Sequence, residues 1–278
     1  MLKTVNTLQK VVLESLGKSP LRGQVALVTG ASSGIGAATA IRLGREGLQV
    51  ILAARRRERL EQVAEQIIQE GGRAQVIIAD LEQVEERQAL VDQVNADYGG
   101  VDVLVNNAGL GWYGYYSEMP MQIVHEMVAV NVAAVTELTR LFLPGMRSRR
   151  RGHIINISSI AGSLPNQGIA IYSASKAFVD AFTTALFREL KGSRVYASVV
   201  RPGPVRTEFF PAAAGREAGK PVPAERFAIS AESVADGICS LLRRPRRVIY
   251  IPWTMRLAPW VEVLFSGVID QLGPLLLR

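Results

Sequence analysis

The sequence is poor in the side chains that cross-link a chain or bind metal ions. Its 278 residues include one cysteine, Cys239, and two histidines, His125 and His153. One thiol excludes a disulfide within the chain, and so few thiols and imidazoles exclude a zinc cluster built from them. We therefore predict no metal site. We interpret all three residues as structural, and a reducing compartment fits this composition.

Long hydrophobic runs are also missing. No stretch approaches the ~18 consecutive apolar residues that a transmembrane helix needs. The N-terminus has no compact apolar core of a signal peptide. We therefore expect a cytoplasmic protein. The apolar residues of the N-terminus recur at helical spacing instead, which predicts an amphipathic helix within residues 1–22.

The balance of charge is only mildly basic. Lys and Arg total 32, Asp and Glu total 25, the net charge is +7, and hydrophobic residues make up 48%. This composition is typical of a globular domain and excludes a largely disordered chain. The arginines gather at 55–59, 147–151 and 243–247, but no nucleic-acid-binding motif accompanies them. We therefore expect no nucleic-acid partner.

The sequence does contain a regular alternation of short Val- and Ile-rich runs with segments of helical length, one of them predicted from Met121 to Leu143. Such runs are typical of parallel strands that are buried on both faces. Because strand–helix crossovers are right-handed, we expect a single α/β domain, a Rossmann-type doubly wound parallel sheet with helices on both faces. We place this domain at 23–252, with an irregular substrate-lid insert at 203–229 and an apolar tail at 253–278.

A glycine-rich turn follows the first predicted strand. It reads Thr29-Gly30-Ala31-Ser32-Ser33-Gly34-Ile35-Gly36. Glycines let the backbone approach a phosphate closely, and the helix that follows presents free N–H groups and the positive end of its dipole. This arrangement favours the pyrophosphate of a dinucleotide. The alternative is a tight turn without a ligand.

The second predicted strand ends in Ala54-Arg55-Arg56, without the acidic residue that binds the adenosine ribose of NAD. An arginine at this place would pair with the 2′-phosphate of NADP. Basic residues are also disfavoured at the start of a helix, so a cluster there indicates a nearby anion. We therefore predict NADP(H). The alternative is an exposed basic helix start.

Ser159 follows the fifth predicted strand, and Tyr172 and Lys176 share one face of the next helix. A free tyrosine titrates at about pH 10, and a neighbouring ammonium is expected to lower that pKa. Such a phenol can exchange a proton with a carbonyl or alcohol oxygen, and a serine hydroxyl can hydrogen-bond the same oxygen. Taken alone, the Tyr–Lys pair could equally be an ordinary surface pair.

Together these motifs resemble the classical short-chain dehydrogenase/reductase family, and the resemblance runs from about Gly23 to Ile251. It implies a Rossmann fold and an NADP-preferring oxidoreductase. Members of this family commonly have a basic residue just before the second glycine of the turn, whereas this chain has Ser33 there. The matching elements, in the family's order, are Thr29-Gly30-x-x-x-Gly34-Ile35-Gly36, Asn106-Asn107-Ala108-Gly109, Asn131, Ser159, Tyr172-x-x-x-Lys176 and Arg201-Pro202-Gly203-Pro204-Val205-Arg206-Thr207.

The resemblance also implies roles for the matched positions. Tyr172 would be the general acid/base, and Lys176 would lower its pKa and bind the nicotinamide ribose. Ser159 would polarise the substrate carbonyl, and Asn131 would hold a water that links Lys176 to solvent. The residues expected to bind the cofactor are Gly30, Ser32, Ser33, Gly34, Ile35, Gly36, Arg55, Arg56, Asp80, Leu81, Asn107, Ala108, Gly109, Tyr172, Lys176, Pro202, Gly203, Val205 and Thr207.

The expected activity is hydride transfer between NADP(H) and a carbonyl or secondary alcohol on a bulky apolar molecule, whether steroid-like, fatty or aromatic. The alternative is a non-catalytic dinucleotide-binding sensor or scaffold. The family implies a homodimer or homotetramer. Apolar residues of the tail at helical spacing are interpreted as packing residues, with contact to a membrane surface as the alternative. By the same resemblance, a set of aromatic residues would either line the substrate pocket or serve in packing: Trp112, Tyr113, Tyr115, Tyr116, Phe209 and Phe210.

Overall fold

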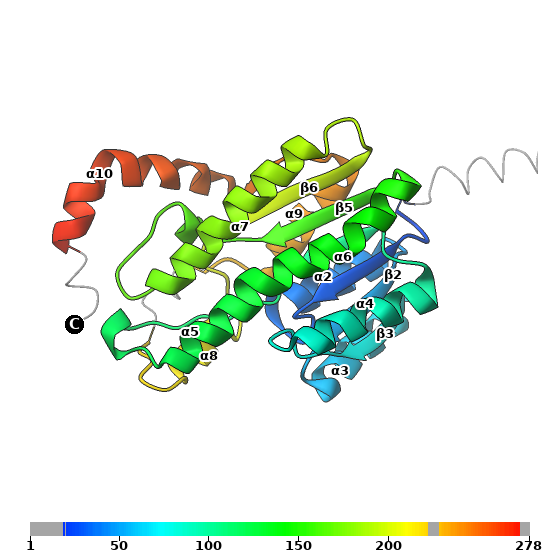
Figure 1. The fold of residues 1–278 in the computed structure, drawn as a ribbon, viewed down its shortest axis with the longest axis horizontal. Helices are drawn as coiled ribbons and strands as arrows, with labels where there is room; N and C mark the ends of the chain where they lie inside the picture. Colours follow the sequence, from blue (N-terminus) through cyan, green and yellow to red (C-terminus); the bar gives the residue numbers. More distant parts are fainter. Residues whose placement is uncertain (1–18, 20, 222–227, 273–278) are drawn as a thin grey trace, which may run out of the picture.

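Seven parallel strands form one sheet in the order β3-β2-β1-β4-β5-β6-β7 in the computed structural model, which describes residues 19, 21–221 and 228–272 (Figure 1). The predicted doubly wound parallel sheet is confirmed. Most of the predicted N-terminal helix lies outside the described residues. The strands are β1 (Val25–Thr29), β2 (Gln49–Ala54), β3 (Arg73–Ile78), β4 (Val103–Asn106), β5 (Gly152–Ile157), β6 (Val195–Pro202) and β7 (Val248–Ile251).

Helices cover both faces of the sheet. The strands alternate their side chains between the faces, so Ala26 and Val28 of β1 join one hydrophobic core and Leu27 joins the other. All three are completely buried. The helices α2 (Gly34–Arg45), α3 (Arg57–Gln69) and α9 (Ala231–Arg243) pack on the first face, and α4 (Val84–Tyr98), α6 (Ala134–Arg149) and α7 (Ala170–Glu189) on the second.

One continuous helical stretch is built from α5 (Met121–Val128), a π-helical turn η2 (Ala129–Ala133) and α6. The predicted end at Leu143 is wrong, because α6 continues through Pro144 to Arg149. The proline removes only one helical hydrogen bond, and the burial of Phe142 and Met146 against the sheet holds the helix on both sides of it. Met121–Arg149 is long and apolar enough to cross a membrane, but 44% of its apolar window is buried inside the protein.

The segments after β4, β5, β6 and β7 carry the remaining elements. These are η1 (Tyr116–Glu118), η3 (Ile160–Gly162), α8 (Phe209–Ala214), η5 (Trp253–Leu257) and α10 (Ala258–Leu272). The insert predicted as irregular therefore contains a helix, and Val205 and Ile229 join its two ends in a parallel β-bridge. Residues 222–227 of the insert lie outside the described part. In Figure 1, α10 runs away from the sheet.

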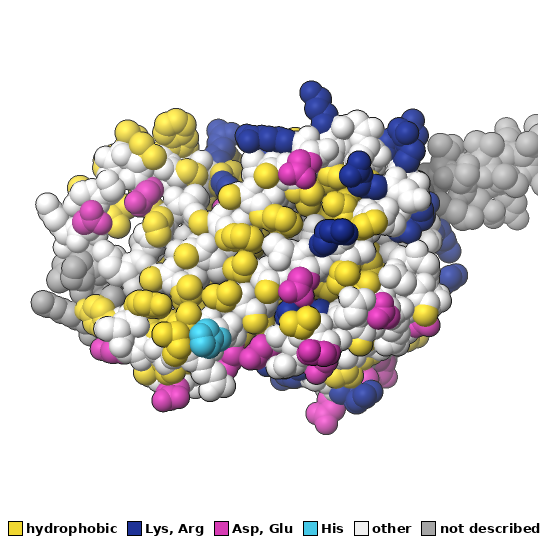
Figure 2. All heavy atoms as spheres, in the orientation of Figure 1, with side chains coloured by type: hydrophobic (Ala, Val, Ile, Leu, Met, Phe, Trp, Pro, Cys, Tyr) yellow, Lys and Arg dark blue, Asp and Glu magenta, His cyan; other side chains and the backbone are white. Residues whose placement is uncertain are grey.

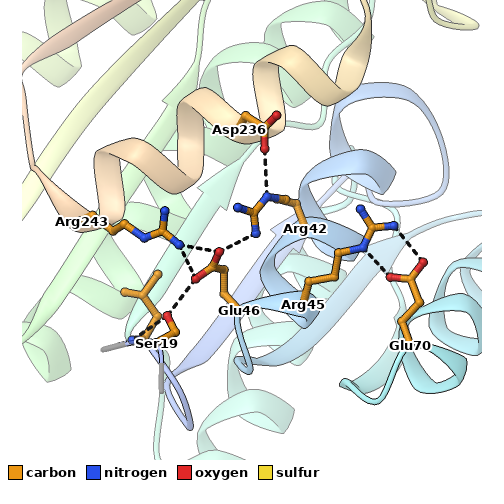
Figure 3. Close-up of polar contacts among 8 residues, drawn as sticks. Ser19, Arg42, Arg45, Glu46, Glu70, Asp236 and Arg243 are labelled. Carbon is orange, nitrogen blue, oxygen red and sulfur yellow. Dashed lines mark hydrogen bonds and ion pairs between the residues drawn. The ribbon is translucent and has the colours of Figure 1, made fainter. Parts of the chain in front are cut away.

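A charged cluster ties the C-terminal end of α2 to its neighbours (Figure 3). The Glu46 side chain, which is 8% exposed, pairs with Arg42 at 2.5 Å and with Arg243 of α9 at 2.6 Å. It also accepts a hydrogen bond from the Ser19 hydroxyl at 2.8 Å. Burial alone would raise the pKa of Glu46, but these three donors hold it at about 2. The cluster therefore keeps a buried carboxylate ionised.

Candidate active site

A cavity of about 530 Å³ opens beyond the carboxyl ends of the strands, where the strand order reverses between β1 and β4. This is the place where open α/β sheets bind ligands, and the volume suits a small molecule or cofactor. Of the site residues predicted from the sequence, all line the cavity except Gly36 and Asn131. The structure therefore brings together positions that are up to 177 residues apart, from Gly30 to Thr207.

The glycine-rich turn requires its glycines for two different reasons. Gly30 and Gly34 have φ angles of +64° and +55°, in the left-handed region that favours glycine. Gly36 lies behind the cavity, where a Cβ would stand 2.3 Å from the Gly30 carbonyl oxygen. The Asn107 side-chain amide donates to the carbonyls of Thr29 at 2.9 Å and Gly30 at 3.3 Å. Asn107 thus fixes the shape of the turn with the same side chain that lines the cavity.

Thr29 is a residue that the sequence argument gave no role. Its hydroxyl donates to the Val105 carbonyl at 3.3 Å and accepts hydrogen bonds from the backbone N–H groups of Asn107 and Ala108. One side chain therefore joins the end of β1 to the segment after β4. Its position beside the first glycine was the available signal, but sequence spacing does not show which loop a hydroxyl will contact.

Asn131 sits in η2 and is completely buried. Its amide donates to the Leu110 carbonyl at 2.9 Å and to the Ser175 hydroxyl at 3.1 Å, while its oxygen accepts from the Leu110 N–H at 2.8 Å. The same oxygen lies 3.4 Å from where a Cβ on Gly109 would stand, and the Lys176 Nζ lies 3.5 Å from that point. Asn131 therefore lies behind the residues that line the cavity, close to Lys176.

Tyr172 and Lys176 both project from α7 toward the cavity. The Lys176 ammonium donates to the Ile157 carbonyl at 2.9 Å and lies 5.7 Å from the centre of the Tyr172 ring. Burial lowers the pKa of Lys176 to about 8, and the charge of Asp180 acts in the opposite direction. Burial raises the pKa of Tyr172 to about 12 against a hydrogen bond with Ser159.

The expected lowering of the tyrosine pKa is therefore wrong for this structure. Removing the phenol from water disfavours the charged phenolate, and this effect of burial prevails although the Lys176 ammonium lies 5.7 Å from the ring centre. The raised pKa determines which form of the phenol is present. Tyr172 is protonated at neutral pH, which is the form that donates a proton to an oxygen.

The two arginines after β2 have different surroundings. The Arg56 guanidinium donates to the hydroxyls of Ser32 at 3.1 Å and Ser33 at 2.7 Å, and it pairs with Glu208 at 2.8 Å. Arg55 is 58% exposed, and its nearest carboxylate oxygen, on Asp80, is 3.7 Å away. Arg55 is thus the more available cation for an anionic ligand.

Glu208 was not anticipated from the sequence. Hydrogen bonding to Arg56, with further help from the charges of Arg56 and Arg59, lowers its pKa against the effect of burial. The residue follows Thr207 and directly precedes α8, so its ion pair ties the start of that helix to Arg56. The sequence pointed to Glu208 only through its position next to the motif that ends at Thr207. An acidic residue is also unexpected beside a predicted anion site.

The aromatic residues divide between the cavity and its surroundings. Trp112, Phe209 and Phe210 line the cavity, whereas the three tyrosines at 113, 115 and 116 do not. The ring of Phe209 lies 5.4 Å from that of Tyr172, centre to centre, at an angle of 50°. The Trp112 indole is buried and donates to the Glu217 carbonyl at 2.9 Å. The cavity wall nearest to Tyr172 is therefore aromatic.

Sequence comparison places the chain among known proteins. The model of the short chain dehydrogenase family matches residues 24–217. A very-long-chain 3-oxoacyl-CoA reductase from Anas platyrhynchos is 40% identical over 196 residues, which cover 68% of this chain and 62% of that protein. The chain spans between 19% and 64% of the length of this and three other curated relatives.

Two solved structures share the fold. A metagenomic short-chain oxidoreductase in complex with NADP is 40% identical, with a TM-score of 0.69, over 80% of this chain and 91% of that one. A short chain dehydrogenase/reductase from Burkholderia phymatum in complex with NAD is 28% identical, with a TM-score of 0.78, over 88% of this chain and 95% of that one. The neighbours thus include complexes with either dinucleotide.

Proposed function

The chain belongs to the short-chain dehydrogenase family, and from that premise we propose that it transfers a hydride between NADP(H) and a carbonyl or secondary alcohol. One observation carries the proposal: Ser159, Tyr172 and Lys176 converge on the same cavity as the glycine-rich turn. A proton donor and a dinucleotide-binding turn in one cavity are what a carbonyl reductase needs.

Tyr172 is the proposed proton donor. Its raised pKa keeps the phenol protonated, and the Ser159 hydroxyl beside it can hydrogen-bond the same substrate oxygen. Lys176 is held behind the phenol by its bond to the Ile157 carbonyl, where a cation stabilises negative charge that develops on the tyrosine oxygen. This arrangement supports reduction of the carbonyl when the tyrosine starts protonated.

The residues of the cavity fit an NADP(H) cofactor, which when bound supplies or accepts the hydride. Gly30 and Gly34 line the cavity without side chains of their own, so the backbone of the turn can approach a pyrophosphate there. Arg55 and Arg56 would hold the 2′-phosphate, with Arg55 the freer of the two. The NADP complex of the metagenomic oxidoreductase supports this choice. The acidic residue that would favour NAD is missing after β2.

The proposed substrate is bulky and apolar. The substrate side of the cavity is lined by Leu110, Trp112, Leu164, Phe209 and Phe210. Such a wall favours a hydrocarbon or aromatic group next to the reacting carbonyl. The name of the 3-oxoacyl-CoA reductase from Anas platyrhynchos favours a fatty chain among the steroid-like, fatty and aromatic classes. We place the enzyme in the cytoplasm.

We also propose that the enzyme is a homodimer or homotetramer. Figure 2 shows hydrophobic side chains over the face that α6 and α7 form. On α7, Phe178 is 40% exposed, and its ring stacks on that of Phe182 with ring centres 6.0 Å apart. An apolar face on two adjacent helices suits a contact between two copies of the same surface.

The test is NADPH consumption with a panel of long-chain, steroid-like and aromatic ketones, using wild type and Tyr172→Phe. We expect turnover with at least one ketone and a loss of roughly 10²- to 10⁴-fold in kcat for the variant, because the proton donor is removed. NADPH binding, measured by fluorescence, should be the same in both. Binding without turnover on any ketone would favour a sensor or scaffold instead.

A further inference from the structure

A carboxylate lies among the arginines at the end of the cavity where the sequence predicts a phosphate. Glu208, Arg55 and Arg56 all line the cavity. One Glu208 oxygen lies 2.8 Å from Nη1 of Arg56, and the other lies 3.5 Å from Nη2 of Arg59. Hydrogen bonding to Arg56 lowers the pKa of Glu208, so the carboxylate is ionised at neutral pH. This end of the cavity therefore contains an anion that belongs to the protein itself.

The Arg56 guanidinium donates to a protein partner from each of its three nitrogens. Its Nε donates to the Ser32 hydroxyl at 3.2 Å, and its Nη2 donates to the hydroxyls of Ser32 at 3.1 Å and Ser33 at 2.7 Å. Its Nη1 donates to the Glu208 carboxylate. A phosphate that approached Nη1 would meet this carboxylate at the same nitrogen, and like charges so close together repel each other. The phosphate must therefore displace the Glu208 side chain to bind Arg56 there.

The backbone around Glu208 is held by contacts that do not involve Arg56. The Thr207 hydroxyl accepts a hydrogen bond from the Phe209 N–H at 3.2 Å. The Glu208 carbonyl accepts one from the Ala212 N–H at 2.9 Å. The Phe209 ring also packs against the Tyr172 ring, with ring centres 5.4 Å apart. The fold therefore presents the carboxylate to this end of the cavity, and only its side chain needs to move when an anion binds.

We propose that Glu208 competes with the 2′-phosphate of NADP(H) for Arg56 and so reduces the preference of the enzyme for NADPH over NADH. The inference rests on the proposed cofactor, and it assigns a residue that limits selectivity rather than one that supplies it. Both side chains of the ion pair are 48% exposed, so the pair is weak enough to be exchanged for a ligand phosphate. NADH has no 2′-phosphate and leaves the pair in place.

The test is isothermal titration calorimetry of the full chain at low salt with adenosine 2′,5′-bisphosphate and 5′-AMP, which differ only in the 2′-phosphate. We expect Glu208→Gln to bind the bisphosphate about 5-fold more tightly than the wild type does, because glutamine keeps the shape of the side chain without its charge. Binding of 5′-AMP should be the same in both. Fluorescence titration should show the same pattern for NADPH and NADH, and added salt should reduce the gain.

Two further variants show whether Glu208 acts through Arg56. In an Arg56→Ala background, Glu208→Gln should lose most of its effect on the bisphosphate, because the shared cation is gone. Glu61→Gln is the matched control, since Glu61 is 56% exposed, lies 3.8 Å from Nη1 of Arg57 and loses the same charge. It should leave the affinity for both nucleotides unchanged. Glu208 and Glu61 both lie outside the hydrophobic core, so circular dichroism should show the same fold.

An unchanged or weaker affinity of Glu208→Gln for the bisphosphate would overturn the proposal. So would an equal gain for 5′-AMP, an equal gain in the Arg56→Ala background, or the same gain from Glu61→Gln. If the wild type binds neither NADPH nor NADH, this inference and the proposed cofactor fail together. The expected binding pattern without turnover on any ketone would support this inference and overturn only the proposed reaction.

Discussion

The two ends of α2 differ in how their charged groups are paired. At its C-terminal end, the buried Glu46 carboxylate has two arginine partners and a serine donor, and its pKa is about 2 (Figure 3). At its N-terminal end the first turn contains no acidic residue and faces the cavity. Across that cavity, the buried Lys176 ammonium is hydrogen-bonded to a carbonyl rather than paired with a carboxylate, and its pKa is about 8.

The difference shows that paired and unpaired buried charges serve different purposes in the same fold: Glu46 contributes to stability, and Lys176 lies where chemistry is proposed. A buried charge with partners keeps its ionised form and strengthens the native state. A buried charge without an ion-pair partner is destabilising, and its protonation equilibrium moves toward the working pH range. The end of α2 that is saturated with partners is therefore structural. The N-terminal end of α2 has no acidic side chain in its first turn and lines the cavity, so its free N–H groups suit an anionic ligand.

The sharpest test of this contrast is Lys176→Met. We expect kcat to fall by roughly 10³-fold, because the cation behind Tyr172 is lost. The free energy of unfolding should stay the same or rise, because an apolar side chain of similar size replaces a buried ammonium. Urea denaturation and steady-state kinetics on the same preparations measure both. A large loss of stability would show that Lys176 is a structural residue.

The opposite pattern is expected for Glu46→Gln. Because the folded-state pKa of Glu46 is about 2 rather than 4.5, its ionisation contributes stability above pH 4.5 that is lost as the pH falls toward 2. This contribution is at most about 3 kcal/mol. We expect the variant to unfold about 2 kcal/mol more easily at pH 7, with unchanged kcat. Its stability should also vary less with pH below 4.5 in urea titrations. An unchanged acid-unfolding profile would contradict the assignment.

The smallest expected effect concerns the cofactor. Arg55→Ala should weaken NADPH binding about 10-fold and leave NADH binding unchanged, since only the charge pair with the 2′-phosphate is removed. Arg57→Ala is the control, because Arg57 is 68% exposed, lies on the same helix start and pairs with Glu61. Fluorescence titration of wild type and both variants with NADPH and NADH measures these affinities. Equal weakening for NADPH and NADH would rule out a 2′-phosphate contact.

The sequence predicted the sheet and most of the cavity lining because both follow from short patterns of neighbouring residues. Buried runs predict strands, and motifs at strand ends meet at one edge of a parallel sheet. Such patterns could not predict the shift in the pKa of Tyr172, because the direction of that shift depends on how fully the folded protein excludes water from the phenol. The contact of Glu208 with Arg56 joins residues 152 positions apart and depends on how the segment after β6 folds back toward β2. The continuation of α6 past Pro144 likewise depends on tertiary packing.

The π-helical turn at Ala129–Ala133 makes the active site depend on residue count as well as residue type. A π turn holds one more residue than the α-helix around it, so Asn131 faces Leu110 and Ser175 only in that local register. Deleting one residue from the turn would let it close as an ordinary α-helical turn, which keeps α5 and α6 in phase but moves Asn131 out of the register that meets Leu110 and Ser175. A single deletion there would therefore misplace Asn131 behind the cavity while every side chain that lines the cavity remained present.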